Sequence, residues 1–143
     1  MSLSPTLNRI NKSRNVSVDM SNTTYFRGIR GAITVDQNDR AEILTNTREL
    51  LDTLIKENNI HTDDIASIFF SVTQDLNAEF PAVAARDMGL VHTPLLCLNE
   101  IDVPGKLKLC IRVLMHVNTP KAQKEVRHAY LRNAVSLRPD HTN

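Results

Sequence analysis

The stretch that decides the fold is YFRGIRGAITV at residues 25–35, which is mostly apolar and includes several β-branched side chains. This composition is typical of a buried β-strand. The two glycines, Gly28 and Gly31, indicate that another backbone or a ligand approaches the strand closely. Arg30 stands between them, although arginine is seldom buried without an anionic partner. This strand therefore supplies both an element of the core and the first candidate functional residue.

The segments that follow alternate between helical and extended patterns. Apolar residues recur at helical spacing over residues 43–58, which predicts an amphipathic helix. Residues 65–72 have the composition of a second strand, and Pro and Gly at positions 81 and 89 enclose a short helix. A third strand is predicted at 95–100. After a Pro-Gly turn, residues 107–117 alternate well enough to form a fourth.

The end of the chain completes the predicted fold class. Thr119 and Pro120 fit the cap and first position of a helix running to about residue 131, and residues 134–137 fit a short final strand. The late elements are too short for a doubly wound nucleotide-binding fold. The sequence therefore predicts an α+β protein with a mixed sheet packed against helices.

Domain organisation follows from composition along the chain. Residues 1–24 are rich in Ser, Asn and Thr without a sustained period, so we expect a flexible N-terminal tail. Residues 25–143 have a length that suits a single domain.

Composition also excludes several classes of function. Seventeen basic and sixteen acidic residues leave a formal charge of +1, and only 4% of the residues are aromatic. Neither a basic field nor a base-stacking platform for nucleic acid is present. No apolar run approaches the roughly 20 residues that span a bilayer, and the opening segment lacks a secretory signal. We expect a soluble, cytoplasmic protein whose cysteines, Cys97 and Cys110, are unpaired.

Three arginines occupy positions where a cation is unusual. Arg30 lies inside the first predicted strand, Arg112 inside the fourth, and Arg138 at the end of the last. Any one of them could reach solvent at a sheet edge or pair with an internal carboxylate. Together they favour a site for a carboxylate or phosphate ligand, because the planar guanidinium can bind such groups through two parallel hydrogen bonds.

Two further residues are candidates for the same site. Glu100 ends a short strand, where functional groups commonly lie, and is the best candidate counter-charge for the arginines. A plain internal salt bridge is the alternative. Tyr130 follows Arg127 by three residues on the predicted last helix, so the two would share one face. Core packing of the ring would explain Tyr130 equally well.

The spacing of the candidate residues indicates neither a metal site nor a catalytic nucleophile. The candidate ligands lack the paired spacing of zinc sites: Cys97, Cys110, His116 and His128. Neither Ser71 nor Cys97 lies in a motif that marks a nucleophile. We therefore expect no metal and no cofactor.

Five segments, taken in order, resemble the monofunctional, non-helical trimeric chorismate mutases: FRGIRGAITV at 26–35, TQDLNAEFPAVAAR at 73–86, LCLNEIDVPG at 96–105, CIRVLMHV at 110–117 and RHAYLRNAVSLRPD at 127–140. The resemblance covers nearly everything after residue 24. It implies an isomerase that rearranges chorismate to prephenate on the way to phenylalanine and tyrosine. It also implies a trimeric pseudo-barrel, a homotrimer with its sites at the subunit interfaces.

The resemblance implies roles for individual residues as well. Arg30 is expected to bind a substrate carboxylate, Arg112 to donate to the ether oxygen, and Glu100 to accept from the ring hydroxyl. Tyr130 is expected to help hold a carboxylate. The other implied site residues are Phe80, Ala82 and Arg86 from a neighbouring subunit, Cys97 in the pocket, and Leu137 and Arg138 in a C-terminal segment that closes over it. Val83 stands where family members often carry Lys, so a peripheral steering charge is expected to be missing.

Two other functions use the same residues. A non-catalytic trimer could bind a small carboxylate as a sensor through Arg30, Glu100 and Arg112 without turnover. Alternatively, the arginines of a structural subunit could bridge protomers through carboxylates.

Overall fold

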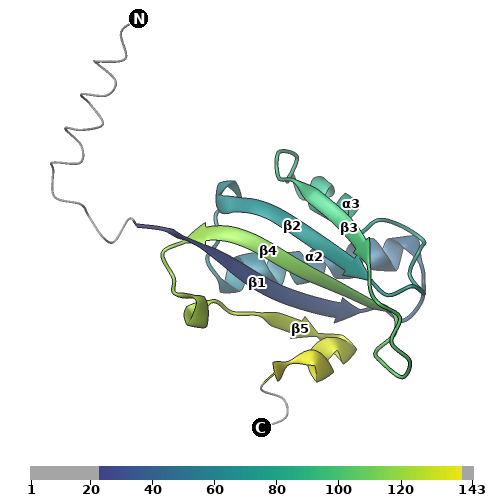
Figure 1. Ribbon diagram of the computed structural model, residues 1–143. Coiled ribbons are helices and arrows are strands. Elements are labelled where there is room, and N and C mark those ends of the chain that lie inside the picture. The colour runs from purple at the N-terminus through teal and green to yellow at the C-terminus, as the bar shows by residue number, and fades with distance from the viewer. Residues whose placement is uncertain (1–22, 140–143) are drawn as a thin grey trace, which may run out of the picture.

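The computed structural model describes residues 23–139, so the predicted tail lies outside the described residues except at its last two positions. Within the described range the chain forms one five-stranded sheet in the order β3-β2-β4-β1-β5 (Figure 1). The strands are β1 (Tyr25–Thr34), β2 (Ile65–Val72), β3 (Leu95–Asn99), β4 (Cys110–Thr119) and β5 (Ala129–Leu131). β4 runs antiparallel to β1 and β2, whereas β3 and β5 run parallel to their neighbours. The sheet is therefore mixed, as predicted.

In residues 23–139, two α-helices and three short 3₁₀ helices accompany this sheet. They are α2 (Arg40–Glu57), α3 (Ala82–Asp87), η2 (Thr62–Asp64), η3 (Gln123–Glu125) and η4 (Arg132–Leu137). The long helix α2 is capped by Asp39, whose carboxylate accepts a hydrogen bond from the backbone N–H of Glu42 at 3.0 Å. Of the helices in residues 23–139, none combines the length and the apolar character needed to cross a membrane.

The core lies between α2 and one face of the sheet. Buried side chains of the helix pack against residues that alternate along the strands, including Ile29 and Ile33 in β1. The apolar residues that α2 buries are Ile43, Leu50, Leu51 and Leu54. Because successive strand residues point to opposite faces, the intervening positions of β1 and β4 lie on the other face of the sheet.

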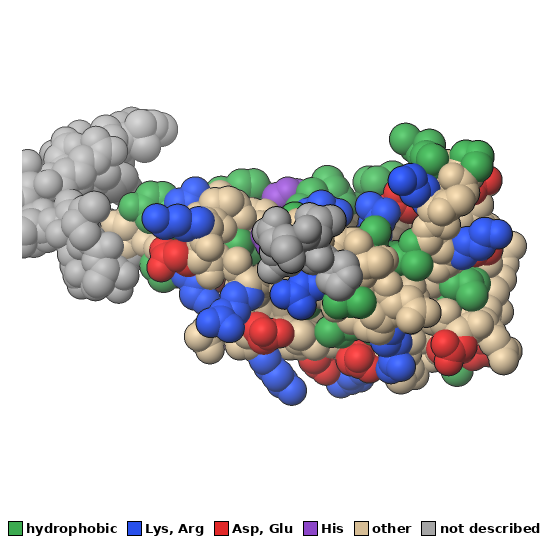
Figure 2. All heavy atoms as spheres, turned by 90° about the horizontal axis from the view of Figure 1, so that it is seen from below, with side chains coloured by type: hydrophobic (Ala, Val, Ile, Leu, Met, Phe, Trp, Pro, Cys, Tyr) green, Lys and Arg blue, Asp and Glu red, His purple; other side chains and the backbone are tan. Residues whose placement is uncertain are grey.

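That other face, here called the open face, carries exposed apolar side chains. Phe26 is 61% exposed, Leu96 51% and Leu98 48%. In Figure 1 the open face is turned toward the viewer, with α2 behind the sheet. Figure 2, seen from below, shows hydrophobic side chains along this side and charged side chains on the opposite, helical side. An apolar sheet face of this kind is typical of an interaction surface.

The predictions for the first two thirds of the chain are confirmed. β1, α2, β2, α3 and β3 lie where the patterns placed them, within a few residues. β4 begins at Cys110, three residues later than predicted, because residues 101–108 form a loop. Cys97 and Cys110 are both free thiols.

The predictions for the end of the chain are wrong in two places. The helix expected up to residue 131 is instead a short 3₁₀ turn followed by β5, and the expected final strand is the 3₁₀ helix η4. The Asn58 side chain holds residue 127 extended, because it accepts from the Arg127 N–H and donates to the Arg127 carbonyl. Arg127 and Tyr130 therefore share no helix face. Arg138 follows a 3₁₀ helix and ends no strand.

At Gly31, neighbouring elements approach the β1 backbone so closely that a side chain would not fit. A Cβ at this position would lie 3.0 Å from the terminal methyl carbons of Leu50 and Leu54 and 3.3 Å from the carbonyl oxygen of Ala129. Two elements thus pack directly on the β1 backbone. The inference that another backbone approaches this strand closely is confirmed.

We predict that Gly31→Ala lowers the free energy of unfolding by about 1–3 kcal/mol relative to Gly28→Ala, because only the first substitution overpacks the core. A Cβ at Gly28 meets one side-chain atom at 3.5 Å, an ordinary contact. Urea unfolding of both variants at one protein concentration measures the difference. Equal stabilities would contradict the packing argument.

Candidate active site

Arg30, Arg112 and Tyr130 come together on the open face. In the strand register Ala32 pairs with Arg112 on one side and with Tyr130 on the other, and Arg30 lies two residues before Ala32 on the same face. Adjacent strands lie about 4.8 Å apart, so the backbones that carry Arg112 and Tyr130 are separated by about 10 Å across the small Ala32. Two arginines and a tyrosine thus surround one strip of the open face, the part of β1 around Ala32.

Glu100 is the counter-charge of Arg112. Glu100 Oε1 lies 3.3 Å from Arg112 Nε, and the two side chains are 23% and 35% exposed. The Glu100 N–H donates to the Val72 carbonyl at 2.8 Å, which fixes the residue directly after β3. The buried Nε makes no hydrogen bond within the described residues, because its N–H is not aligned with the carboxylate despite the short separation. The pair is therefore an electrostatic contact that leaves this donor unsatisfied.

A small apolar cluster lies beside this ion pair. Ala32, Cys110 and Ala134 are buried together, and Leu107, Tyr130 and Leu137 pack against them. Burial raises the pKa of the Cys110 thiol to about 11, against the opposing charge of Arg112. The thiol is therefore neutral at physiological pH and serves as packing. η4 forms one wall of the cluster, because its Ala134 is buried there and its Leu137 packs against it.

The remaining predicted residues form a second group at the opposite edge of the sheet. Phe80, which is 66% exposed, and Cys97 line a cavity of about 370 Å³. Burial raises the pKa of Cys97, while the Ala82 backbone and the charge of Arg86 act to lower it, so these three residues are neighbours. Val83 is half-buried on α3 and brings no charge.

Within one chain, Cys97 and Arg112 lie on different faces of the sheet. Cys97 pairs with Phe70 of β2 and packs on the helix-covered side, opposite to the face that carries Arg112. β2 separates β3 from β4 in the sheet. The fold thus divides the predicted residues into an arginine group (Arg30, Glu100, Arg112, Tyr130, Leu137, Arg138) and an α3–β3 group (Phe80, Ala82, Arg86, Cys97).

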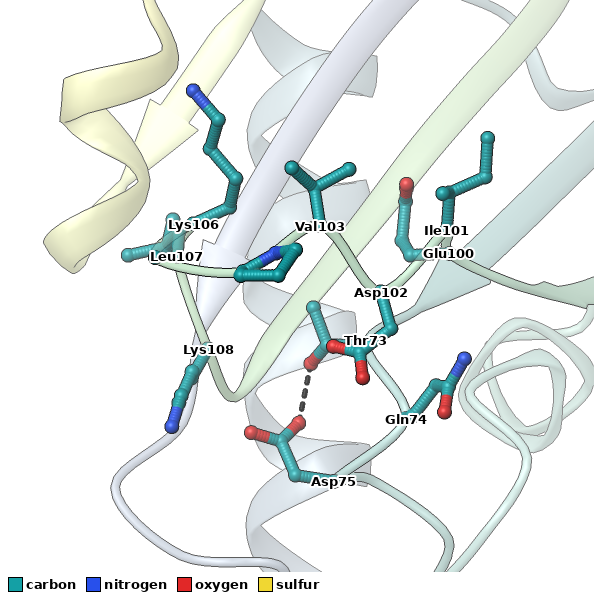
Figure 3. A pocket seen from close by; sticks show the side chains of 12 residues that line it. Thr73, Gln74, Asp75, Glu100, Ile101, Asp102, Val103, Lys106, Leu107 and Lys108 are labelled. Carbon is teal, nitrogen blue, oxygen red and sulfur yellow. Dashed lines mark hydrogen bonds between the residues drawn. The ribbon is translucent and has the colours of Figure 1, made fainter.

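The structure adds contacts that the sequence patterns did not indicate. His128 Nδ1 accepts a hydrogen bond of 2.9 Å from the Arg30 backbone N–H, which fixes the strand position that carries this guanidinium. A second cavity, of about 620 Å³, lies between residues 73–75 and the loop 100–108 and includes Glu100 in its lining (Figure 3). Within the range 23–139, no three His, Cys, Asp or Glu side chains gather where they could hold a metal ion.

The His128 contact predicts a pH dependence of stability. Partial burial and the nearby Arg30 charge lower the pKa of His128. The unfolded chain, with an ordinary His pKa of about 6.5, therefore binds more protons just below that pH, and stability falls as pH falls through this window. Urea unfolding at pH 7.5 and at pH 5.5 should show a smaller loss for His128→Gln, which keeps an acceptor but does not titrate. An identical loss in both proteins would contradict this role.

Comparison with known proteins identifies the family of this chain. Residues 26–141 match the family model of chorismate mutase type I. Chorismate mutase AroH of Bacillus subtilis (strain 168) is 47% identical over 116 residues, which cover 80% of this chain and 91% of the relative. Chorismate mutase AroH of Thermus thermophilus is 50% identical over 115 residues, with coverages of 80% and 94%. The solved chorismate mutase of Clostridium thermocellum superposes with a TM-score of 0.75 at 53% identity, covering 76% of this chain and 97% of its own. The chain therefore belongs to the chorismate mutase type I family.

Proposed function

We propose that this chain, an isomerase, converts chorismate to prephenate at the arginine group of the open face, and that a neighbouring subunit of a homotrimer completes each site. The observation that carries the proposal is the arrangement of Arg112, Glu100, Arg30 and Tyr130 on adjacent rigid elements. We further propose that the product serves phenylalanine and tyrosine synthesis. The cytoplasmic location stays a prediction.

The reaction sets modest chemical demands on these residues. Within one molecule an ether C–O bond breaks while a C–C bond forms, so no atom, proton or electron pair has to be exchanged with the protein. The substrate must be held compact, and the negative charge that grows on the ether oxygen must be stabilised. Prepositioned donors can meet both demands without a metal or a nucleophile.

Arg112 is suited to stabilise the ether oxygen. It lies on the central strand β4 beside Glu100, whose carboxylate restrains its position, and its buried Nε lacks a hydrogen-bond partner among the described residues. A donor held in a partly desolvated place costs little reorganisation when charge develops. Arg30 and Tyr130 border the same strip and are the candidates for holding the carboxylates. Glu100 is the candidate acceptor for the ring hydroxyl.

Two observations support completion of the site by a second copy. The α3–β3 group lies across the sheet from the arginine group, so one chain leaves each half-site incomplete. The open face also carries exposed Phe26, Leu96 and Leu98, a surface that association would remove from water. A heterologous, head-to-tail contact closed by threefold rotation would bring the α3–β3 group of one subunit to the arginine group of the next.

We predict that the wild-type protein consumes chorismate in chelator-containing buffer with prephenate as the product, and that Arg112→Ala lowers kcat by about 100- to 1000-fold. The absorbance of chorismate and chromatography of the product measure both. Arg48→Ala is the control, because Arg48 is exposed on α2, on the helical side of the sheet, and should leave turnover unchanged.

Two results would contradict this assignment. Near-wild-type turnover by a folded Arg112→Ala variant would remove Arg112 from the reaction. Absence of turnover in a folded wild-type trimer that still binds chorismate would favour the non-catalytic carboxylate-binding protein.

The shared site predicts complementation between inactive variants. Arg112→Ala and Arg86→Ala should each be nearly inactive, but subunits exchanged at equal amounts should recover about a quarter of wild-type activity, because that fraction of interfaces combines two intact half-sites. The measurement is turnover before and after mixing under conditions that permit subunit exchange. Recovery that fails although mass spectrometry detects mixed trimers would place both arginines in one subunit's site.

A further inference from the structure

The loop 100–108 contains a lysine, Lys106, that lies near the arginine group. It lines the larger cavity together with residues 73–75, and its basic residues are Lys106 and Lys108. Figure 3 shows the side chains of Glu100 and Lys106 on the same side of this loop, whereas Lys108 points to the opposite side. Asp102 also points away from Glu100 in this view. Lys106 and Glu100 thus lie on one side of the loop, and Lys108 and Asp102 lie on the other.

Local backbone geometry determines where Lys106 stands. The Lys106 N–H donates to the Val103 carbonyl at 3.3 Å, and Gly105 adopts φ of 78°. Proline at the second position and a positive-φ glycine at the third are typical of a type II turn, here Val103–Pro104–Gly105–Lys106. Any residue with a side chain would be strained at Gly105. Lys106 therefore follows a turn that the sequence itself specifies.

The next residues fix the loop to the site. Leu107 packs against the cluster of Ala32, Cys110 and Ala134, which also contacts Tyr130 and Leu137. The Leu109 N–H donates to both oxygens of the Asp75 carboxylate, at 3.2 Å and 3.0 Å. The contacts of Leu107 and Leu109 thus hold Lys106 near the apolar cluster that η4 borders.

The ammonium group of Lys106 is available to an anionic ligand. It is exposed, and no carboxylate of the described residues forms an ion pair with it, whereas Arg40 and Arg132 pair with Glu79 and Glu49. The nearby Asp75 carboxylate is occupied by Leu109 and by the Thr73 hydroxyl. An unpaired ammonium at a site entrance attracts anions over a distance set by the ionic strength, about 30 Å at 0.01 M salt and 3 Å at 1 M.

We propose that Lys106 captures the dianionic substrate electrostatically at the entrance of the site and takes no part in the bond rearrangement. The inference rests on the proposed function, because it requires a small dianion as substrate. Lys106 acts before the chemical step, because its long-range attraction raises the local concentration of substrate at the arginines. The lysine should therefore affect substrate capture and leave the chemical step unchanged.

The test compares Lys106→Glu with the matched charge reversal Lys108→Glu. At about 0.01 M salt, kcat/KM of Lys106→Glu should fall about tenfold through KM, with kcat unchanged, and the deficit should shrink to less than about twofold near 1 M salt. Lys106→Arg should restore the wild-type value. Lys108→Glu should lower kcat/KM by a smaller factor than Lys106→Glu at about 0.01 M salt, because its side chain points to the other side of the loop, and by less than about twofold near 1 M salt.

Each contrary outcome separates this inference from the proposed function. Equal losses in the two charge reversals would show a general effect of net charge, and a deficit that persists at high salt or lowers kcat would show a structural effect. Either result overturns the role of Lys106 while wild-type turnover still supports the mutase. Absence of turnover in the wild-type protein would instead overturn the proposed function, and this inference with it.

Discussion

One constraint organises the molecule: within the described residues, α2 and α3 cover one face of the sheet, and the other face is open except at the end where η4 packs on Ala32 and Cys110. Side chains alternate along each strand, so the same segment of β1 contributes Ile29 and Ile33 to the core and Arg30 to the open face. β4 repeats this division, with Val113 and Met115 buried on one side and Arg112 on the other. An arginine can therefore lie within an apolar strand, because its side chain points to the face that the core does not occupy.

This division also makes the site rigid. A guanidinium on a central strand has its backbone fixed by ladders on both sides, and packing of the core against α2 holds those ladders in place. Arg112 gains a further restraint from Glu100 and an apolar surround from the Cys110 cluster. As an exposed pair these charges would contribute only about 0–1 kcal/mol to stability. Their value lies in position, because catalysis by preorganised donors depends on groups that do not have to move.

Much of the scaffold is predictable from sequence because its signals are local. The helix α2 has a helical apolar period and β2 a compact strand composition, and both patterns are complete within the segment itself. Arg30, Arg112 and Glu100 were recognisable because charges within or at the end of apolar strands are conspicuous. Their proximity required the register, which pairs Ala32 with both Arg112 and Tyr130 and is not contained in any single segment.

The final third resists such prediction because distant side chains determine its backbone. Asn58 binds both polar groups of Arg127, 69 residues away, and Gln123 binds both polar groups of Gly28, 95 residues away. These amides take the place of backbone partners, so a segment with a plausible helix start becomes extended. Gln123 also covers part of the β1 edge that the short strand β5 does not reach, since β5 pairs only with residues 31–33. His128 completes this cover at Arg30 itself, so the segment whose conformation was hardest to predict is the one that fixes the first arginine of the site.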